Sequence, residues 1–367
     1  MKNITFILNF ESFGGVETVF ILWCSVLIKK YNVQVISLNK IPETILSFIQ
    51  QNNIKYIEKD NTIKERNICN LKRYILYQIH KIQLNKSFSK MLKQSDVIVD
   101  FKNGIGFKYI NKYKSSKVLI IHGGLPYFEN FIKCDLSKYK KIVILTDTLK
   151  DQLKQLYPSL KDKFERIYNP IDFKTIQHKS TMLNCCNIEK GYFLHVSRLN
   201  KDKDIKTLID GYDLFYQKTL SNTYLYIVGD GPEKKVLEQY AKQKQSNNQI
   251  IFYGMQENPF PFMKKAKAVV LSSPSEGFGY VLLEGMCCTD GVIVSSDCPS
   301  APREILNDGR CGVLFDTGNS LELSIVLEKI DNGSITRKQF AKNIEKHIKK
   351  FDYAAVEKDI DKLFLYI

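Results

Sequence analysis

The chain lacks an apolar run long enough to cross a membrane. Hydrophobic residues make up 44% of its 367 residues, but none of their runs reaches the ~20 residues that a spanning helix needs. The start of the chain, Met1 to Asn9, is too short for the apolar core of a signal peptide and has no small-residue cleavage site. We therefore expect a cytoplasmic protein, with contact to the inner face of the cytoplasmic membrane left open.

The cysteines and histidines lack the spacing of a metal site or of a disulfide framework. Nine cysteines, an odd number, are scattered without a C-x-x-C pair, and the five histidines show no metal-ligand spacing. We expect free thiols in a reducing compartment. We also expect no bound metal and no resident cofactor.

Arginine is scarce, so the formal net charge of +15 comes almost entirely from lysine. Basic runs such as Lys108–Lys117 and the basic residues between Lys64 and Lys93 are candidates for contact with a membrane or a lipid carrier. Each cation near an anionic lipid surface contributes ~1 kcal/mol. A general bias of the composition toward Lys, Asn and Ile explains the excess equally well. No nucleic-acid motif accompanies the charge, so we expect no nucleic-acid partner.

No Pro/Gly linker, repeat or low-complexity tract interrupts the chain, and its length suits two domains of ~150–200 residues. Apolar runs between helical patterns predict two series of buried parallel strands. The first series of strands is expected at residues 4–9, 33–37, 97–100, 117–121 and 141–145. The second is expected at residues 191–196, 223–228, 250–253, 268–271 and 291–295. We predict an α/β protein with Rossmann-like doubly wound domains at 1–175 and 176–348. A C-terminal helix, 349–367, would pack back on the first domain.

Two carboxylates eight positions apart form the most informative motif, Glu276 to Glu284. The first follows turn-forming residues and the second lies in an apolar run that reads as a helix. A helix rises ~1.5 Å per residue, so the two carboxylates are expected to lie roughly 12 Å apart along its axis. That is about the span from a sugar, across a diphosphate, to a ribose. Amides at the start of the helix would suit a phosphate.

A second motif, Ser197 to Asp204, follows a predicted strand and precedes a predicted helix at 205–212. Arg198 and Lys203 stand on one loop and can converge on one anion. A guanidinium fork and an ammonium together suit a diphosphate. A solvated charged loop is the alternative, although the scarcity of arginine favours a specific use of Arg198.

Glycines and histidines follow other predicted strands. Gly14 and Gly15 would let the backbone approach a bulky ligand, but the pattern is not G-x-G-x-x-G, which disfavours a dinucleotide. His122 ends a predicted strand, so it is expected to face a ligand cleft. His195 is expected to pack or to support the loop after it. Gly229-Asp230-Gly231 is interpreted as a structural turn, and Arg303 and Glu304 are candidates for a mutual ion pair.

These motifs together resemble the large retaining nucleotide-sugar glycosyltransferase family of GT-B fold, known as group 1 or the E-x7-E family. The resemblance covers most of the chain. It rests on the following segments, in this order: Gly14–Glu17, Asn169–Asp172, Ser197–Lys203 and Glu276–Glu284, with 297–304 after them. It implies two Rossmann-like domains facing a cleft. Ser197, Asp204 and Ala301 stand where the family often has glycine.

The resemblance implies a role for each matching position. Arg198 and Lys203 would bind the donor diphosphate, and Glu284 the ribose hydroxyls. Glu276, with the amides of Phe278 and Gly279, would hold the transferred sugar. Further donor contacts would come from Gly14, Gly15, Met255 and, beside the reacting carbon, His122. The expected catalytic group is therefore His122, Glu276, Arg198 and Lys203.

The function implied is a retaining, metal-independent transfer of a hexose or N-acetylhexosamine. The donor would be a nucleotide sugar, expected to be UDP-linked, and the acceptor a lipopolysaccharide, capsule or lipid-linked glycan. Two alternatives stay open: a sugar-nucleotide epimerase of the same fold, and a non-catalytic nucleotide-binding protein. The sequence gives neither the sugar nor the acceptor.

Overall fold

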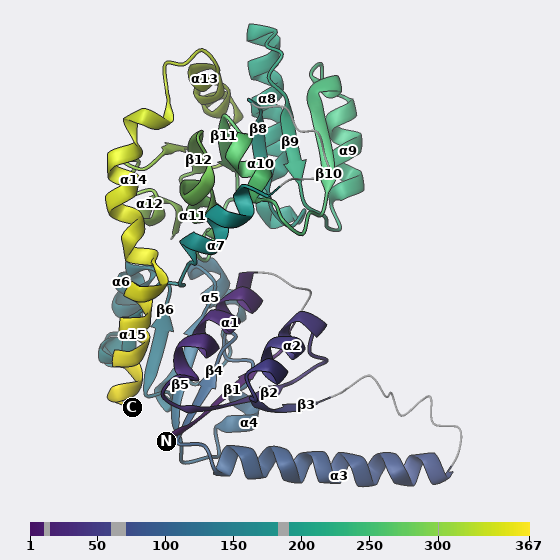
Figure 1. Ribbon diagram of the computed structural model, residues 1–367, viewed down its shortest axis with the longest axis vertical. Helices are drawn as coiled ribbons and strands as arrows, with labels where there is room; N and C mark the ends of the chain where they lie inside the picture. Colours follow the sequence, from purple (N-terminus) through teal and green to yellow (C-terminus); the bar gives the residue numbers. More distant parts are fainter. Residues whose placement is uncertain (11–14, 60–70, 183–190, 300) are drawn as a thin grey trace. The chain divides into compact units, whose positions relative to one another are not determined.

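The computed structural model describes residues 1–10, 15–59, 71–182, 191–299 and 301–367. The chain divides into two compact units, Met1–Pro170 with Val356–Ile367, and Ile171–Ala355. Each unit is a parallel sheet with helices (Figure 1), which confirms the predicted α/β class with two Rossmann-like domains. The first unit ends five residues before the expected 175, since the chain enters α7 (Phe173–Ser180) directly after the turn at 169–172.

The first unit holds a seven-stranded sheet in the order β3-β2-β1-β4-β5-β6-β7, with every neighbouring pair parallel. Its strands are β1 Asn3–Leu8, β2 Asn32–Ser37, β3 Lys55–Glu58, β4 Val97–Asp100, β5 Ser116–Ile121, β6 Lys141–Ile144 and β7 Phe164–Arg166. Its helices are α1 Gly15–Leu27, α2 Glu43–Gln51, α3 Leu71–Lys93, α4 Phe107–Ile110, α5 Leu125–Phe131 and α6 Asp147–Leu156. Strand β1 lies inside this sheet between β2 and β4, and its residues Ile4 to Leu8 are all buried.

The second unit repeats this plan with a six-stranded parallel sheet in the order β10-β9-β8-β11-β12-β13. Its strands are β8 Phe193–Val196, β9 Leu225–Val228, β10 Ile250–Gly254, β11 Ala268–Leu271, β12 Val292–Ser296 and β13 Val313–Phe315. Its helices after α7 are α8 Ile205–Thr219, α9 Lys234–Lys242, α10 Phe260–Lys265, α11 Tyr280–Cys288, α12 Ala301–Ile305, α13 Ser320–Asp331 and α14 Ala341–His347.

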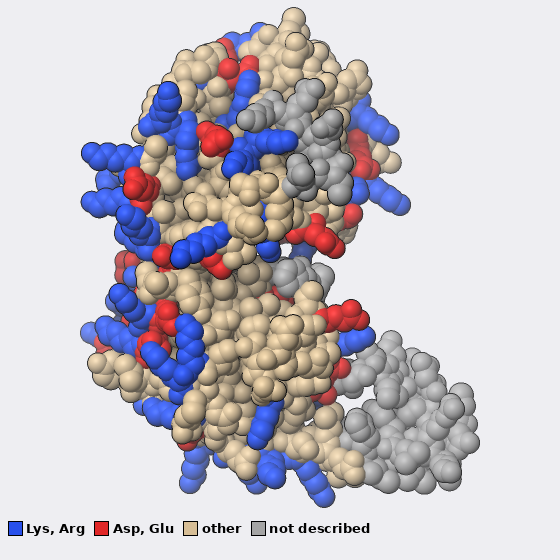
Figure 2. All heavy atoms as spheres, in the orientation of Figure 1, with Lys and Arg blue, Asp and Glu red and all other residues tan. Residues whose placement is uncertain are grey.

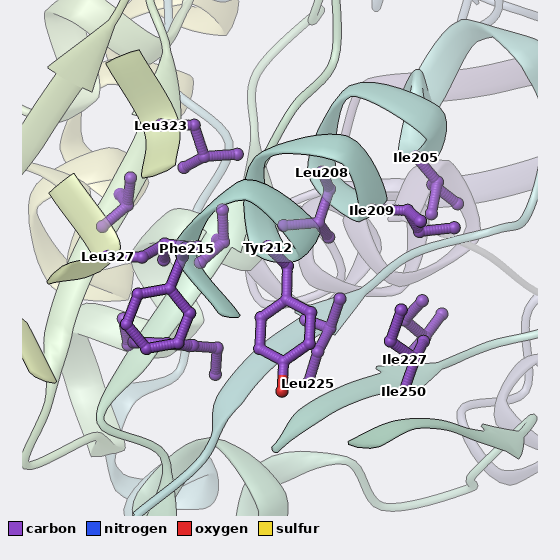
Figure 3. Packing of buried hydrophobic residues seen from close by; sticks show 14 of the residues in the cluster. Ile205, Leu208, Ile209, Tyr212, Phe215, Leu225, Ile227, Ile250, Leu323 and Leu327 are labelled. Atoms are coloured by element: carbon purple, nitrogen blue, oxygen red, sulfur yellow. The ribbon is translucent and has the colours of Figure 1, made fainter. Parts of the chain in front are cut away.

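The core of the second unit forms where α8 packs between the sheet and α13. Leu208, Tyr212 and Phe215 of α8 are buried against strand residues and against Leu323 and Leu327 of α13 (Figure 3). Gly211 allows the close approach, because a Cβ there would lie 2.9 Å from Leu323 Cδ2. This packing extends α8 to Thr219, seven residues beyond the predicted helix.

The C-terminal helix α15 spans Tyr353–Leu365, and a short 3-10 turn, Ile348–Phe351, precedes it. The helix therefore begins four residues after the expected 349. Its later part packs with the first unit, where Lys29 pairs with Glu357 and Lys30 with Asp361. No helix in the described ranges is both long and apolar enough to span a bilayer.

Candidate functional site

The candidate site of the second unit lies where its strand order reverses. Strands β8 and β11 are neighbours in the sheet but are separated by two strands in the sequence. In open parallel sheets, ligands bind at the carboxyl ends of such a pair. The loop after β8 carries Arg198 and Lys203, and the loop after β11 carries Glu276. The fold thus brings together two motifs that lie far apart in the sequence.

An ion pair joins these two loops directly. Lys203 Nζ lies 2.6 Å from Glu276 Oε1, and the two side chains are only 19% and 10% exposed. Ser272 Oγ strengthens the connection by donating a hydrogen bond to the Lys203 carbonyl oxygen at 3.0 Å. Lys203, expected to bind the diphosphate, is therefore in contact with Glu276, expected to hold the sugar. The spacing within either motif did not predict this contact.

Two serines, which the sequence reasoning did not single out, hold the Glu276 carboxylate. Ser273 Oγ donates to Glu276 Oε1 at 2.6 Å, and Ser296 Oγ, at the end of β12, donates to the Ser273 carbonyl oxygen at 2.6 Å. Both described bonds to the carboxylate end on Oε1, so Oε2 can accept from a ligand hydroxyl. The run Ser272-Ser273 before the motif was the available signal, but it was interpreted only as turn formation.

The Arg198 side chain is exposed and forms no hydrogen bond or ion pair with the described residues, while its neighbour Leu199 is buried. The backbone around it is fixed by the turn after β9, where Leu199 N donates to the Asp230 carbonyl at 2.9 Å. That turn requires glycine: a Cβ on Gly229, whose φ is 143°, would lie 1.8 Å from Ser197 O. The structural role predicted for this turn is confirmed, and it holds Arg198 toward solvent.

His195 supports the same loop from inside the sheet. Its Nδ1 lies 2.9 Å from the Val270 carbonyl and its Nε2 lies 2.7 Å from Ser197 Oγ. A carbonyl only accepts, so Nδ1 carries the proton and Nε2 accepts from the serine hydroxyl. Burial lowers the pKa of His195 to about 4, which keeps the ring neutral. The expected supporting role of His195 is confirmed.

Glu284 stands on α11, which begins at Tyr280 after Gly279 in the left-handed region with φ 80°. Only Tyr280 to Glu284 is helical within the motif, so the continuous helix from which roughly 12 Å was estimated is not present. The Glu284 side chain forms no hydrogen bond or ion pair with the described residues. Burial raises its pKa to about 7. A half-buried carboxylate without a partner among the described residues is suited to accept from ligand hydroxyls.

Other expected donor contacts in this unit differ in exposure. Phe278 is buried and packs edge-on against Tyr280 and Phe351, so it can offer its backbone but not its ring. Met255 follows β10 and is 68% exposed. The preceding residue Gly254 accepts a hydrogen bond from Gly229 N at 2.8 Å, which ties the Met255 loop to the turn that supports Arg198.

His122 belongs to the first unit and follows β5, next to the end of β4. Its Nε2 lies 2.7 Å from the Phe101 carbonyl, so Nε2 carries the proton. Its Nδ1 is buried and has no hydrogen-bond partner within the described residues. Burial lowers the pKa of His122 to about 4. The result is a neutral imidazole whose remaining nitrogen can accept from a ligand hydroxyl.

The two glycines expected to contact the donor also belong to the first unit. Gly15 opens α1, and Gly14 lies outside the described residues.

One ion pair near the site differs from the sequence-based interpretation. Arg303 does not pair with Glu304; its guanidinium binds Asp297 instead, with Nε 3.1 Å from Oδ1. The proline-containing loop after β12 brings that aspartate within reach. In addition, Asp202 and Asp204 flank Lys203 with D-x-D spacing, but Asp204 Oδ2 accepts from Thr207 Oγ1 at 2.6 Å at the start of α8.

Comparison with known proteins gives a family for the second unit. Residues 187–347 match the family described as glycosyl transferases group 1. The chain is 27% identical over 230 residues to the N-acetylgalactosamine-N,N'-diacetylbacillosaminyl-diphospho-undecaprenol 4-alpha-N-acetylgalactosaminyltransferase of Campylobacter jejuni, covering 62% of this chain and 61% of that protein. It is 28% identical over 267 residues to the lipopolysaccharide 1,6-galactosyltransferase of Salmonella typhimurium, covering 68% of this chain and 70% of that one.

Among solved structures, the fold is similar to that of HepE from Anabaena in complex with UDP and glucose. The TM-score is 0.76 at 17% identity, and the similarity covers 100% of both chains. At this identity the likeness concerns the fold. It agrees with the predicted GT-B fold.

Proposed function

We propose that this chain, a member of the group 1 glycosyltransferase family, transfers a hexose or N-acetylhexosamine from a nucleotide sugar to a lipopolysaccharide, capsule or lipid-linked glycan. The observation that carries the proposal is the cluster at the β8/β11 switch point. There an exposed Arg198 stands on the same loop as Lys203, and Lys203 lies 2.6 Å from Glu276 Oε1. Cations that can bind a diphosphate thus lie next to a carboxylate that can accept hydrogen bonds from sugar hydroxyls.

UDP is the proposed carrier of the sugar. The similar fold of HepE was solved with UDP and glucose, and two relatives are named as a galactosyltransferase and an N-acetylgalactosaminyltransferase. In this chain Glu284 would accept from the ribose hydroxyls, while the exposed Met255 loop would contact the base. His122, with its free Nδ1, would accept from a hydroxyl of the transferred sugar.

In the proposed reaction, the bond between the anomeric carbon and the donor's β-phosphate oxygen breaks as the acceptor oxygen attacks. Arg198 and Lys203 would stabilise the negative charge that develops on the leaving diphosphate, an effect worth several kcal/mol. The two cations could do this without a divalent metal. Hydrogen bonding of Glu276 to Lys203 and Ser273 leaves it as a sugar ligand rather than a nucleophile. We therefore propose attack from the face of the leaving group, with retention, and transfer of the acceptor's proton to the departing phosphate oxygen.

Peripheral contact with an anionic membrane is part of the proposal. Lys86, Lys90 and Lys93 of α3 are exposed, and Lys and Arg are numerous on the face drawn in Figure 2, where they are interleaved with acidic residues. Vesicles containing phosphatidylglycerol should bind the protein, whereas neutral phosphatidylcholine vesicles should not. Equal binding to both would remove the electrostatic part of the proposal.

A screen of UDP-, GDP- and ADP-sugars tests the function. The protein should be stabilised by one UDP-sugar and should slowly release UDP from it, and a glycan acceptor should accelerate that release. An epimerase would instead convert the sugar nucleotide without an acceptor and without releasing UDP. A non-catalytic binding protein would be stabilised but would leave the sugar nucleotide unchanged.

A further inference from the structure

A cavity in the second unit lies at the opposite edge of the sheet from the proposed donor site. Its volume is about 290 Å³. It is lined by the residues that precede three strands: Gly191 before β8, Lys264 to Lys267 before β11, and Asp290 and Gly291 before β12. In a parallel sheet these amino ends share one edge, so this cavity and the switch-point site are separated by the length of the strands.

The lining of this cavity is predominantly cationic. Lys264, Lys265, Lys267 and Arg337 contribute four basic side chains, against the single carboxylate of Asp290. Lys267 is already neutralised, because its Nζ lies 2.6 Å from Asp331 Oδ1. Lys264 forms no ion pair with the described residues. Lys264 and Arg337 together outnumber the carboxylate of Asp290, so the cavity retains an excess of positive charge.

Arg337 is the group that most clearly lacks a partner. Its Nη2 donates to the Met286 carbonyl at 2.7 Å, but its Nη1 is buried without a hydrogen-bond partner among the described residues. No carboxylate of the described residues lies within ion-pair distance of it. Burial lowers the pKa of Arg337. Leaving a buried guanidinium nitrogen unsatisfied costs free energy that an acceptor in the cavity would recover.

We infer that this cavity binds a small oxyanion of the phosphate or sulfate class. A guanidinium presents parallel N–H groups that match two oxygens of such an anion, and Lys264 adds a point charge at the same cavity. Ile330, Ile335 and Val292 line the rest of the cavity and offer no carboxylate that would repel such an ion. The inference does not depend on the proposed transferase activity.

Calorimetric titration with inorganic phosphate tests the inference, with sodium chloride holding ionic strength constant. The donor site also contains cations, so the titration uses the Arg198→Ala/Lys203→Ala protein. This protein should still bind one phosphate. Adding Arg337→Gln should weaken that binding at least tenfold, and adding Lys264→Gln should weaken it about threefold. Adding Lys235→Gln, an exposed lysine of α9 outside the cavity, should leave it unchanged.

Absence of phosphate binding in the Arg198→Ala/Lys203→Ala protein would overturn the inference. Equal affinities with the Arg337→Gln, Lys264→Gln and Lys235→Gln additions would also overturn it. Circular dichroism verifies that each variant is folded. If Arg337→Gln is not folded, because it loses its bond to Met286, the comparison of Lys264→Gln with Lys235→Gln decides the question.

Discussion

Lys203 and Glu276 form an ion pair with Nζ 2.6 Å from Oε1, and Ser273 Oγ donates to the same carboxylate oxygen at 2.6 Å. Both side chains are largely shielded from water, so each depends on the other for its charge partner. Removing one leaves the other charge poorly solvated. The pair therefore fixes two loops of the candidate site relative to each other before any ligand binds.

A double-mutant cycle should detect this dependence. Lys203→Ala and Glu276→Gln should each destabilise the protein, and the double variant should be less destabilised than their sum, by about 1–3 kcal/mol. Urea denaturation at pH 7 measures the coupling. Strict additivity would contradict an ion pair in solution. Asp202→Asn serves as the control, because Asp202 lies 3.9 Å from Lys203 and is 62% exposed, and should couple weakly.

Glu284→Gln should separate stability from ligand binding. Burial raises the pKa of Glu284 from 4.5 to about 7, so the folded protein holds this proton more tightly than the unfolded chain does. Stability is then lost as pH rises from 4.5 through about 7, and the loss is complete above it. Gln avoids the loss, so the variant should be about 1–3 kcal/mol more stable than the wild type at pH 8 and equally stable near pH 4.5.

The same variant should raise KM for the nucleotide sugar. The Gln amide presents a hydrogen-bond donor at the place where the ribose hydroxyls need an acceptor. Urea denaturation at the two pH values and donor kinetics at pH 8 provide the two readouts. A variant that is less stable than the wild type at pH 8 would show that the Glu284 carboxylate is not buried without a partner.

Most central strands could be predicted from the sequence, but three edge strands could not. β4 and β11 were predicted to the residue, since all four residues of each strand are buried and only Asp100 among them is polar. β3, β7 and β13 were missed, and each lies at an end of its sheet. An edge strand pairs on one side only, so Lys55–Glu58 can remain polar and Phe164–Arg166 short. Neither has the continuous apolar pattern that signals a buried strand.

The motifs identified the candidate ligands, while contacts between them required the fold. Lys203 and Glu276 are 73 positions apart, and only the adjacency of β8 and β11 brings them together. The start of α11 was placed too early for a local reason. Gly279 adopts a left-handed conformation, which delays the helix to Tyr280, and a single sequence does not reveal φ.

Gly229→Ala should displace the loop that carries Arg198. The new Cβ would lie 1.8 Å from Ser197 O, so backbone must move. We expect a loss of about 2–4 kcal/mol in stability together with reduced donor turnover. Gly318→Ala is the matched control, because Gly318 also has positive φ, at 79°, but nothing within 4 Å of its Cβ. It should cost about 1 kcal/mol and leave turnover unchanged; equal effects at both sites would contradict the supporting role of Gly229.

His122 should remain neutral across the physiological range. Because burial lowers its pKa to about 4, protonation should cost stability only as pH falls below the 6.5 of a free imidazole toward 4. Nitrogen-15 spectra of labelled histidine at pH 6 should show the Nε2–H tautomer for His122. An imidazolium signal at that pH would contradict both the burial and the proposed acceptor role of Nδ1.

The central claim is that Arg198 binds the diphosphate of a nucleotide sugar as that group departs. The measurement is UDP release from the preferred UDP-sugar by the wild type and by Arg198→Ala. The Arg198 side chain is exposed and has no partner among the described residues, so its truncation should not disturb folding. The account predicts a loss of turnover of about 10²-fold or more. A folded Arg198→Ala protein that releases UDP at the wild-type rate would contradict it.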